Sequence, residues 1–368
     1  MLDLDDLLNH DHEGRCSAAA DSLPRVGVET LLVTDPLNIR YLTGFTGSAG
    51  LVHLRSDGEV LLVTDARYAE RAEAECSDHV AVAITKRSDQ GLVVRDHAGE
   101  ATRIGLEGRH ITWAGQREWS AVFERSNRRV VQTLGTIERV RLVKEAAEIE
   151  RITLAASIAD TALAQVKQRL TDGLTERQIK LLLERSMIDQ GADAPAFDTI
   201  VASGPNGASP HHESGDRVIT RGDLVIIDMG ATVDGYRSDM TRTFSVGVPD
   251  AAASSMLRLV GRAQQAGVDA VLQGVSGDEV DKAARSVIAV AGVGDEFVHG
   301  VGHGVGLAIH EAPFLLGSDL PLLSGQVVTV EPGVYRAGLG GVRVEDTVVV
   351  TRKGCRKLTQ HSLDPIVA

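Results

Sequence analysis

Two matching stretches of sequence decide the fold of this chain: GDLVIID at residues 222–228 and GQVVTVE at residues 325–331. Each begins with glycine and a polar residue, continues with a run rich in apolar and β-branched residues, and ends in a carboxylate. An apolar run of this kind is typical of a strand buried on both faces. Each stretch leads into a glycine-rich turn and a predicted returning strand that carries another acid, Asp239 in the first copy and Glu345 in the second.

The repeat also includes the segment upstream of each stretch. GLTERQI at 173–179 and GVSGDEV at 274–280 each combine a glycine, an apolar residue, and a Ser or Thr followed three residues later by Gln or Glu. This capping box predicts the start of an amphipathic helix, which would end at Gly191 or Gly292. We therefore predict that residues 137–368 form one domain of two pseudo-symmetric halves, whose hairpins share one sheet covered by helices.

The preceding part of the chain predicts a smaller domain. Short apolar segments alternate with helical ones, which favours an α/β domain with a mixed sheet over residues 1–136. The segment Asn38–Gly44 is interpreted as a strand end packed by Tyr41 and Leu42, and a long helix is expected to begin near Lys144. The predicted strands are Thr30–Thr34, Leu51–Leu54, Val60–Thr64, Val80–Ile84 and Ile104–Leu106.

Composition narrows the classes of protein to consider. The 368 residues include 38 basic and 51 acidic side chains, a net charge of −13 that argues against nucleic acid or an anionic membrane as partner. No apolar run is long enough to span a bilayer, and three cysteines far apart favour reduced thiols over a disulfide framework. With an acidic N-terminus unlike a secretory signal, these features predict a cytoplasmic globular protein.

Four carboxylates are expected to converge if the two hairpins lie side by side: Asp228, Asp239, Glu331 and Glu345. An isolated ionised carboxylate in a buried strand is costly, and neighbouring like charges raise that cost. Nearby arginines cannot neutralise four negative charges, whereas two divalent ions can. Oxygen ligands with one imidazole suit Mn²⁺, Co²⁺ or Fe²⁺, and also Zn²⁺.

The imidazole would come from the segment at residues 297–313. It contains His299, His303 and His310 interleaved with glycines, which let the backbone approach a ligand closely. A further histidine, His211, lies in a polar loop. The glycine pattern around His303 resembles a phosphate-binding loop only weakly, because the strand and the Lys-Ser/Thr context of such a loop are missing. We therefore interpret the segment as part of a metal site.

The second half of the chain contains, in order, IDMGA (227–231), SDMTRT (238–243), GHGVGL (302–307), HE (310–311), EPGVY (331–335) and VRVED (342–346). This ordered set resembles the pita-bread metallopeptidases, specifically the branch that contains aminopeptidase P and prolidase. The N-terminal part is more loosely similar to the creatinase-type domain of the same branch. The resemblance implies an α+β chain with a pita-bread catalytic domain, whose internal repeat is pseudo-two-fold, after a smaller α/β domain.

Residue by residue, the resemblance implies a dinuclear site. Asp228 would bind one ion, His303 and Glu331 the other, and Asp239 and Glu345 would bridge the two. Mn²⁺ is the expected ion, with Co²⁺, Zn²⁺ or Fe²⁺ as alternatives. Such a pair of ions would activate a water for attack on the peptide bond before a proline. The resemblance also implies a homodimer.

Further site residues follow from the same resemblance. His211, His299 and His310 match the family's active-site histidines outside the metal shell. Glu331 is the candidate general base, and His310 and His211 would stabilise the oxyanion or pass a proton to the leaving nitrogen. His299 would form part of a pocket for the proline ring. Arg343 would bind substrate or orient the metal-binding acids, and the alternative for Arg343 is a purely structural salt bridge.

The expected activity is that of an Xaa-Pro aminopeptidase acting on small peptides with proline in the second position. The alternative is an Xaa-Pro dipeptidase (prolidase), whose members commonly carry an arginine where this chain has Phe314. Two further alternatives are a non-catalytic peptide-binding member of the fold and a creatinase-like amidinohydrolase. Both have less support, because every metal-ligand position holds the expected residue type.

Overall fold

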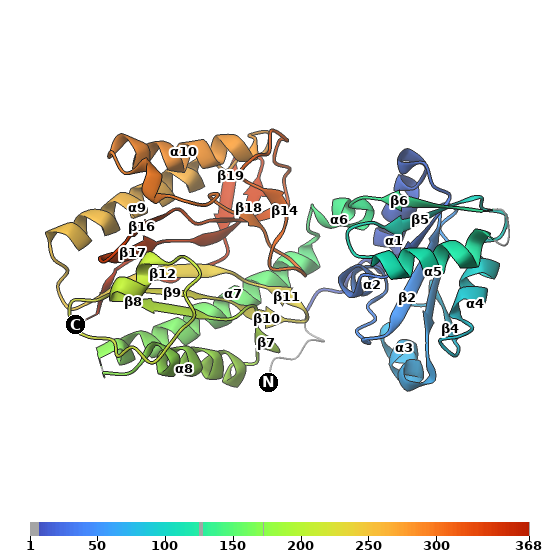
Figure 1. The fold of residues 1–368 in the computed structure, drawn as a ribbon, viewed down its shortest axis with the longest axis horizontal. Coiled ribbons are helices and arrows are strands. Elements are labelled where there is room, and N and C mark those ends of the chain that lie inside the picture. The colour runs from blue at the N-terminus through green and yellow to red at the C-terminus, as the bar shows by residue number, and fades with distance from the viewer. Residues whose placement is uncertain (1–6, 125–127, 172, 368) are drawn as a thin grey trace. The chain divides into compact units, whose positions relative to one another are not determined.

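The computed structural model describes residues 7–124, 128–171 and 173–367 (Figure 1). Helices and strands alternate through the first part of the chain, and two helix-and-strand repeats make up the second. Within these described ranges, no helix combines the length and the apolarity that a membrane crossing requires.

The chain divides into two compact units, residues 10–141 and residues 7–9 together with 142–367. The predicted boundary after residue 136 falls inside α6 (Thr136–Arg141). Arg141 Nη1 donates a buried hydrogen bond to Asn38 Oδ1 at 2.8 Å, which ties the end of α6 to the first unit. The first unit therefore extends beyond the predicted boundary.

The first unit contains a six-stranded sheet in the order β4-β3-β2-β1-β5-β6. The sheet is mixed, as predicted: β2 pairs antiparallel with β1 and β3, whereas β1–β5, β3–β4 and β5–β6 are parallel pairs. All five predicted strands are present, and β6 is an additional one. The strands are β1 (Thr30–Val33), β2 (Gly50–Arg55), β3 (Val60–Thr64), β4 (Val80–Ile84), β5 (Arg103–Glu107) and β6 (Arg129–Thr133).

The segment interpreted as a strand end is instead a helix, α2 (Pro36–Thr43). Asp35 caps it by accepting a hydrogen bond from the Leu37 backbone at 2.9 Å, and Pro36 fits the first helical turn. Gly44 ends it with a left-handed φ of 81°. These local signals outweigh the apolar pair that suggested a strand. The other helices of this unit are α1 (His12–Ser22), η2 (Pro24–Val26), η3 (Ala66–Tyr68), α3 (Ala69–Glu75), α4 (Gln90–His97) and α5 (Trp113–Glu124).

The second unit contains the predicted repeat. α8 (Glu176–Asp189) and α10 (Gly277–Val290) both begin at the predicted capping boxes, on Thr175 and on Ser276. Each cap residue also forms an isolated antiparallel bridge, Thr175 to Val218 and Ser276 to Pro321. The two copies therefore place the start of their helix against the segment that precedes their main strand.

The main strands pair as antiparallel hairpins. β9 (Leu224–Met229) pairs with β12 (Met240–Val246), and β15 (Val327–Val330) pairs with β18 (Asp346–Thr351). Asp228 lies near the end of β9 and Asp239 directly before β12, while Glu331 directly follows β15 and Glu345 directly precedes β18. All four acids thus lie at the same end of their hairpins.

The two hairpins belong to separate sheets and not to one continuous sheet as predicted. β12 and β9 lie in the order β20-β12-β9-β8, with β20 at Ile366–Val367 and β8 at Ile200–Ser203. β15 and β18 lie in the order β14-β13-β15-β18-β19, with β14 at Glu311–Phe314, β13 at His303–Gly304 and β19 at Gly354–Lys357. The two repeats meet where the Thr243 hydroxyl of β12 donates to the backbone oxygen of Arg343, in β17 (Gly340–Arg343), at 2.8 Å and accepts from the Arg343 N–H at 3.0 Å. The Glu345 N–H donates to Thr241 O at 3.0 Å, so the sheets remain in direct contact.

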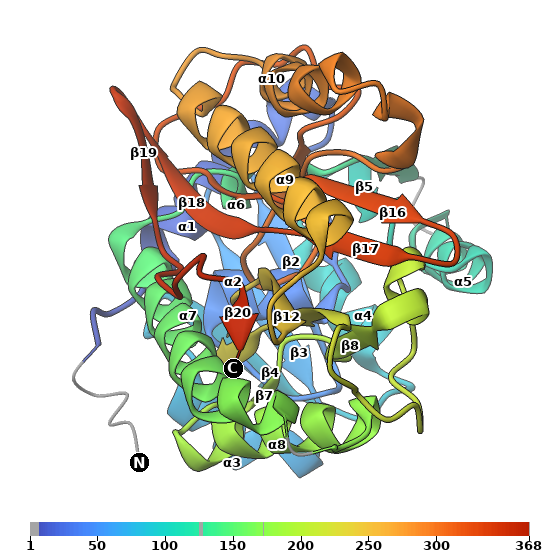
Figure 2. The ribbon, with the colours of Figure 1, turned by 90° about the vertical axis from the view of Figure 1, so that its left-hand side faces the viewer.

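Long helices cover these sheets. α7 (Ala146–Val166) begins close to the predicted position and packs on β10 and β11, whereas α9 (Ala251–Ala270) lies across the strands of the second repeat (Figure 2). Their buried faces form two apolar clusters, one for each repeat. The remaining elements are η4 (Lys167–Thr171), β7 (Ala194–Pro195), β8 (Ile200–Ser203), η5 (Gly204–Ala208), β10 (Ala231–Val233), β11 (Tyr236–Arg237), η6 (Gly294–Glu296), β13 (His303–Gly304), β14 (Glu311–Phe314), β16 (Gly333–Arg336), β17 (Gly340–Arg343), β19 (Gly354–Lys357) and β20 (Ile366–Val367).

Candidate metal centre

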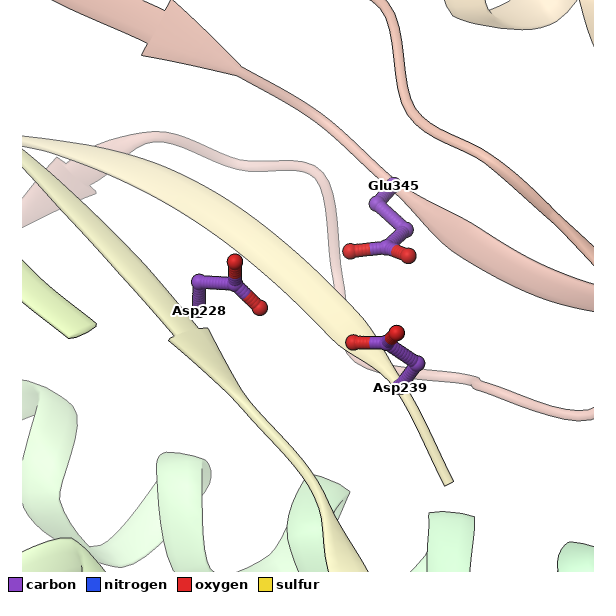
Figure 3. Close-up of side chains that lie close together, drawn as sticks. All are labelled: Asp228, Asp239 and Glu345. Atoms are coloured by element: carbon purple, nitrogen blue, oxygen red, sulfur yellow. The ribbon is translucent and has the colours of Figure 1, made fainter. Parts of the chain in front are cut away.

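Three carboxylates from both repeats meet at the ends of the hairpins. Asp228, Asp239 and Glu345 each offer an oxygen, and these oxygens lie within 4.8 Å of one another. Figure 3 shows the three side chains pointing toward a common centre. Asp239 and Glu345 are buried, with 5% and 1% of their surface exposed. The predicted convergence of the repeats is therefore present in the fold.

His303 and Glu331 lie beside this cluster. The Nε2 atom of His303 is 3.7 Å from Asp239 Oδ2 and 3.4 Å from Glu331 Oε1. The other ring nitrogen, Nδ1, is 3.1 Å from Gly304 O, a contact that requires the proton to be on Nδ1. This tautomer leaves the Nε2 lone pair directed at the acids, as a metal ligand requires.

Burial and mutual repulsion strongly raise the pKa values of these acids. Burial first, and then the charges of Glu345, Asp228 and Glu331, raise the pKa of Asp239 well above its ordinary value. Burial likewise raises the pKa of Glu345 well above its ordinary value and that of Glu331 to about 8. Burial also lowers the pKa of His303 to about 4, so its imidazole is neutral near pH 7.

The donor atoms fit divalent cations. Asp228 Oδ1 and Glu345 Oε1 are buried and have no hydrogen-bond partner among the residues that the structure describes. A buried carboxylate oxygen without a partner is costly unless a cation satisfies it. Oxygen donors with one neutral imidazole match the preferences of Mn²⁺, Co²⁺, Fe²⁺ and Zn²⁺ and do not single out one of them.

Arg343 is already bonded to the protein. Its Nη2 donates to Asp228 Oδ2 at 2.6 Å, its Nε to the Thr241 hydroxyl at 3.1 Å, and its Nη1 to Tyr335 OH at 2.9 Å and Pro210 O at 3.3 Å. Only 2% of its surface is exposed. This arrangement favours the predicted role of orienting the metal-binding acids over direct contact with substrate.

Tyr335 is a site residue to which the sequence assigned no role. Its hydroxyl lies between His299 Nε2, at 2.8 Å, and Arg343 Nη1, at 2.9 Å. It thereby links a predicted substrate-binding histidine to the arginine that contacts Asp228. The available sequence signal was its place in the EPGVY motif that begins at Glu331.

One cavity of about 440 Å³ contains all of the predicted site residues. The His310 ring lies 4.4 Å from the His303 ring, centroid to centroid, so it is close to the carboxylate cluster. Apolar side chains form the rest of the wall, which is the expected character of a pocket for a proline ring. The predicted residues on the wall are His211, Asp228, Asp239, His299, His303, His310, Glu331, Arg343 and Glu345, and the apolar ones include Phe197, Ile200, Ile309, Phe314 and Leu316.

Known proteins resemble this chain in both units. Residues 150–352 match metallopeptidase family M24, and residues 15–143 match the creatinase/prolidase N-terminal domain. The Xaa-Pro dipeptidase of Pyrococcus furiosus is 36% identical over 336 residues, which cover 90% of this chain and 94% of the relative.

Two solved structures have the same architecture over nearly their whole length. The Xaa-Pro dipeptidase from Bacillus anthracis superposes with a TM-score of 0.92 and 34% identity, covering 97% of this chain and 100% of that one. The X-Pro aminopeptidase from Thermotoga maritima superposes with a TM-score of 0.86 and 34% identity, covering 94% and 99%.

The fold of this chain and its similarity to these relatives show that the chain is a hydrolase of the metallo-exopeptidase class. The chain belongs to metallopeptidase family M24. This membership confirms the predicted family, the α+β pita-bread fold and the creatinase-type N-terminal domain. Members of this family depend on divalent metal ions, in agreement with the carboxylate cluster.

The raised pKa values of the buried acids predict how the folding stability of the metal-free protein changes with pH. An acid whose pKa is higher in the folded state binds its proton more tightly there, so stability is lost as pH rises through the folded pKa. Burial lowers the pKa of His299 and His303 to about 4. This shift makes stability rise with pH, opposite to the effect of the acids, and the rise ends near pH 6.5, the ordinary pKa of histidine in the unfolded chain. Between pH 6.5 and 8 the effect of the acids, with Glu331 at about 8, is therefore dominant.

We expect the free energy of unfolding in a chelator to fall from pH 6.5 to pH 8. Urea unfolding at several pH values would measure it. Glu331→Gln should flatten the slope, because the amide does not titrate, whereas Glu118→Gln, at an exposed position, should not. A slope that is flat or rises in the native chain would contradict the predicted repulsion.

Proposed function

We propose that this protein is an Xaa-Pro dipeptidase that uses two divalent metal ions. The observation that carries the proposal is the convergence of Asp228, Asp239, His303, Glu331 and Glu345 in one cavity that also has apolar side chains on its wall. The named relatives include dipeptidases of Pyrococcus furiosus and Bacillus anthracis. These relatives support the Xaa-Pro dipeptidase, which the sequence suggested as the alternative, more strongly than the Xaa-Pro aminopeptidase, which was expected first.

The aminopeptidase is kept as the second candidate for two reasons. The similar structure from Thermotoga maritima is named an X-Pro aminopeptidase. Phe314, on the cavity wall, stands where prolidases commonly have an arginine, and it is half exposed. Substrate length is therefore the property that an assay must decide.

Asp228, Asp239, His303, Glu331 and Glu345 would hold the two ions, as the resemblance implies. When bound, the ions would lower the pKa of a water toward neutrality and polarise the substrate carbonyl. Glu331 would receive the proton of that water on a carboxylate oxygen, and Thr329 Oγ1 donates to its Oε1 at 3.3 Å.

The histidines would handle the substrate. Burial lowers the pKa of His310 and, to about 4, that of His299, so both are neutral hydrogen-bonding groups near pH 7. His310 and His211 would donate to the developing oxyanion or pass a proton to the leaving proline nitrogen. His299, fixed by Tyr335, would form part of the wall for the proline ring. Mn²⁺ as the ion, a homodimer and a cytoplasmic location belong to the same proposal.

An assay of substrate length tests the proposal. With Mn²⁺, we expect kcat/KM for an Xaa-Pro dipeptide to exceed that for the matching Xaa-Pro-Yaa tripeptide about tenfold or more, because a dipeptidase binds the free carboxylate of the proline. EDTA should abolish the activity, and Mn²⁺ or Co²⁺ should restore it. An Xaa-Ala dipeptide serves as the control for proline selectivity. A preference for the tripeptide would establish the aminopeptidase, and EDTA-resistant turnover would refute the metal mechanism.

A further inference from the structure

A buried carboxylate on α8 holds the loop that carries His211. Glu176 is fully buried, and its Oε1 accepts from the Ser203 N–H and hydroxyl, both at 2.7 Å, and from Asn206 Nδ2 at 3.0 Å. Its Oε2 accepts from Gly215 N at 3.1 Å and lies 2.8 Å from His212 Nε2. These five contacts fix both ends of the loop and the immediate neighbour of His211.

Glu176 is ionised in this position. Burial opposes its charge, but hydrogen bonds from Ser203 and His212 outweigh that penalty and hold its pKa below the ordinary value. Its place in the first turn of α8 adds the favourable field of the helix N-terminus. Because the proposed chemistry uses no part of this carboxylate, its contacts point to a role in placing the loop.

The second repeat has an anchor of the same kind on α10. Asp281 is buried and accepts from Val301 N at 2.9 Å and from Arg285 Nε at 2.7 Å. Arg285 in turn donates to the carbonyl oxygens of Phe297, at 2.9 Å, and His299, at 2.7 Å. This pair holds the loop that presents His299.

The two anchors occupy different positions in the repeat for a steric reason. The residue of α10 that corresponds to Glu176 is Gly277, which also directly follows the cap residue. A Cβ on Gly277 would lie 2.9 Å from Phe314 O, so no side chain fits there. The anchor of the second repeat is instead Asp281, one helical turn later.

We propose that Glu176 and Asp281 are positioning residues, each for one histidine of the cavity: Glu176 for His211, and Asp281, through Arg285, for His299. His211 and His299 lie on the wall of the same cavity but belong to different loops. The inference rests on the proposed peptidase function, since it assigns both histidines to substrate handling. It predicts that a substitution of either anchor lowers activity mainly through that anchor's own histidine.

Crossed double-mutant cycles test this pairing. Glu176→Gln should lower kcat/KM about 30-fold in the native chain, because small misplacements of a catalytic group are costly. Glu176→Gln should lower kcat/KM less than about threefold when His211→Ala is already present, but it should retain its full effect when His299→Ala is present. Asp281→Asn should show the reverse pattern. Asp189→Asn, on the exposed face of α8, is the matched control and should have no effect.

Amide hydrogen exchange provides a measurement that does not depend on activity. Glu176→Gln should speed exchange at Ser203 and Gly215 but not at Val301, and Asp281→Asn should do the opposite. If Glu176→Gln fails to fold, His212→Ala removes one donor at a partly exposed position and takes its place. Unchanged kcat/KM in folded variants, or equal losses in both histidine backgrounds, would overturn the inference. An inactive native chain with the expected exchange pattern would refute only the proposed function.

Discussion

Replacing Glu331 by glutamine is expected to lower kcat for Xaa-Pro cleavage by about 10³-fold or more. Glutamine has the same shape and can still accept the hydrogen bond from Thr329 Oγ1. It can neither take a proton nor supply the negative charge beside His303 Nε2, which is 3.4 Å away. General-base catalysis alone contributes about 10²- to 10⁴-fold, and weaker metal binding adds to the loss.

The measurement is kcat on an Xaa-Pro dipeptide with saturating Mn²⁺, together with metal content and circular dichroism. Glu118→Gln, a surface change in the first unit, is the control and should behave as the native chain does. Near-native turnover by a folded Glu331→Gln protein would exclude Glu331 as the general base. Loss of activity with full metal content would assign the defect to proton transfer.

Asp239→Asn is expected to change activity and stability in opposite directions. Asp239 is buried between Glu345, Asp228 and Glu331, whose charges oppose its ionisation. Asparagine cannot ionise, so it avoids the cost of placing an ionisable carboxyl group in this buried acidic cluster, and it is expected to stabilise the chelator-treated protein by about 1–3 kcal/mol at pH 8. The same change removes a proposed bridging ligand, so activity should fall by about 10³-fold or more.

Urea unfolding at pH 8, with and without Mn²⁺, would measure the first effect. The native chain should gain stability from the ion and Asp239→Asn should gain little, because only a protein that binds the ion is stabilised by it. Asp319→Asn removes an exposed acid and is the matched control. If Asp239→Asn destabilises the chelator-treated protein, Asp239 is not repelled by its neighbours and the electrostatic basis of the metal site is wrong.

Local sequence signals were sufficient for much of the fold. The capping boxes at Thr175 and Ser276 predicted the starts of α8 and α10, because a cap forms within a few residues. The apolar runs that end in Asp228 and Glu331 predicted β9 and β15 and the repeat. The segment at Asn38–Gly44 was misread because the evidence for α2 lay in Asp35 and Pro36, just before it.

Other features depend on contacts between distant parts of the chain. The junction of the two repeats includes the Thr243 hydroxyl, which bonds to the backbone of Arg343 from the other repeat. The end of the first unit depends on Arg141 reaching Asn38. Neither contact has a local signature, since each joins residues about a hundred positions apart.

The sequence by itself determined the family, the repeat and the types of ligand, because these depend on residue order and on the chemistry of carboxylate and imidazole groups. Only the tertiary structure decided which atoms meet: the free oxygens of Asp228 and Glu345, the saturation of Arg343 and the hydroxyl of Tyr335 between two site residues. The physical reason is that strand pairing and burial, and not spacing along the chain, set the distances between charges.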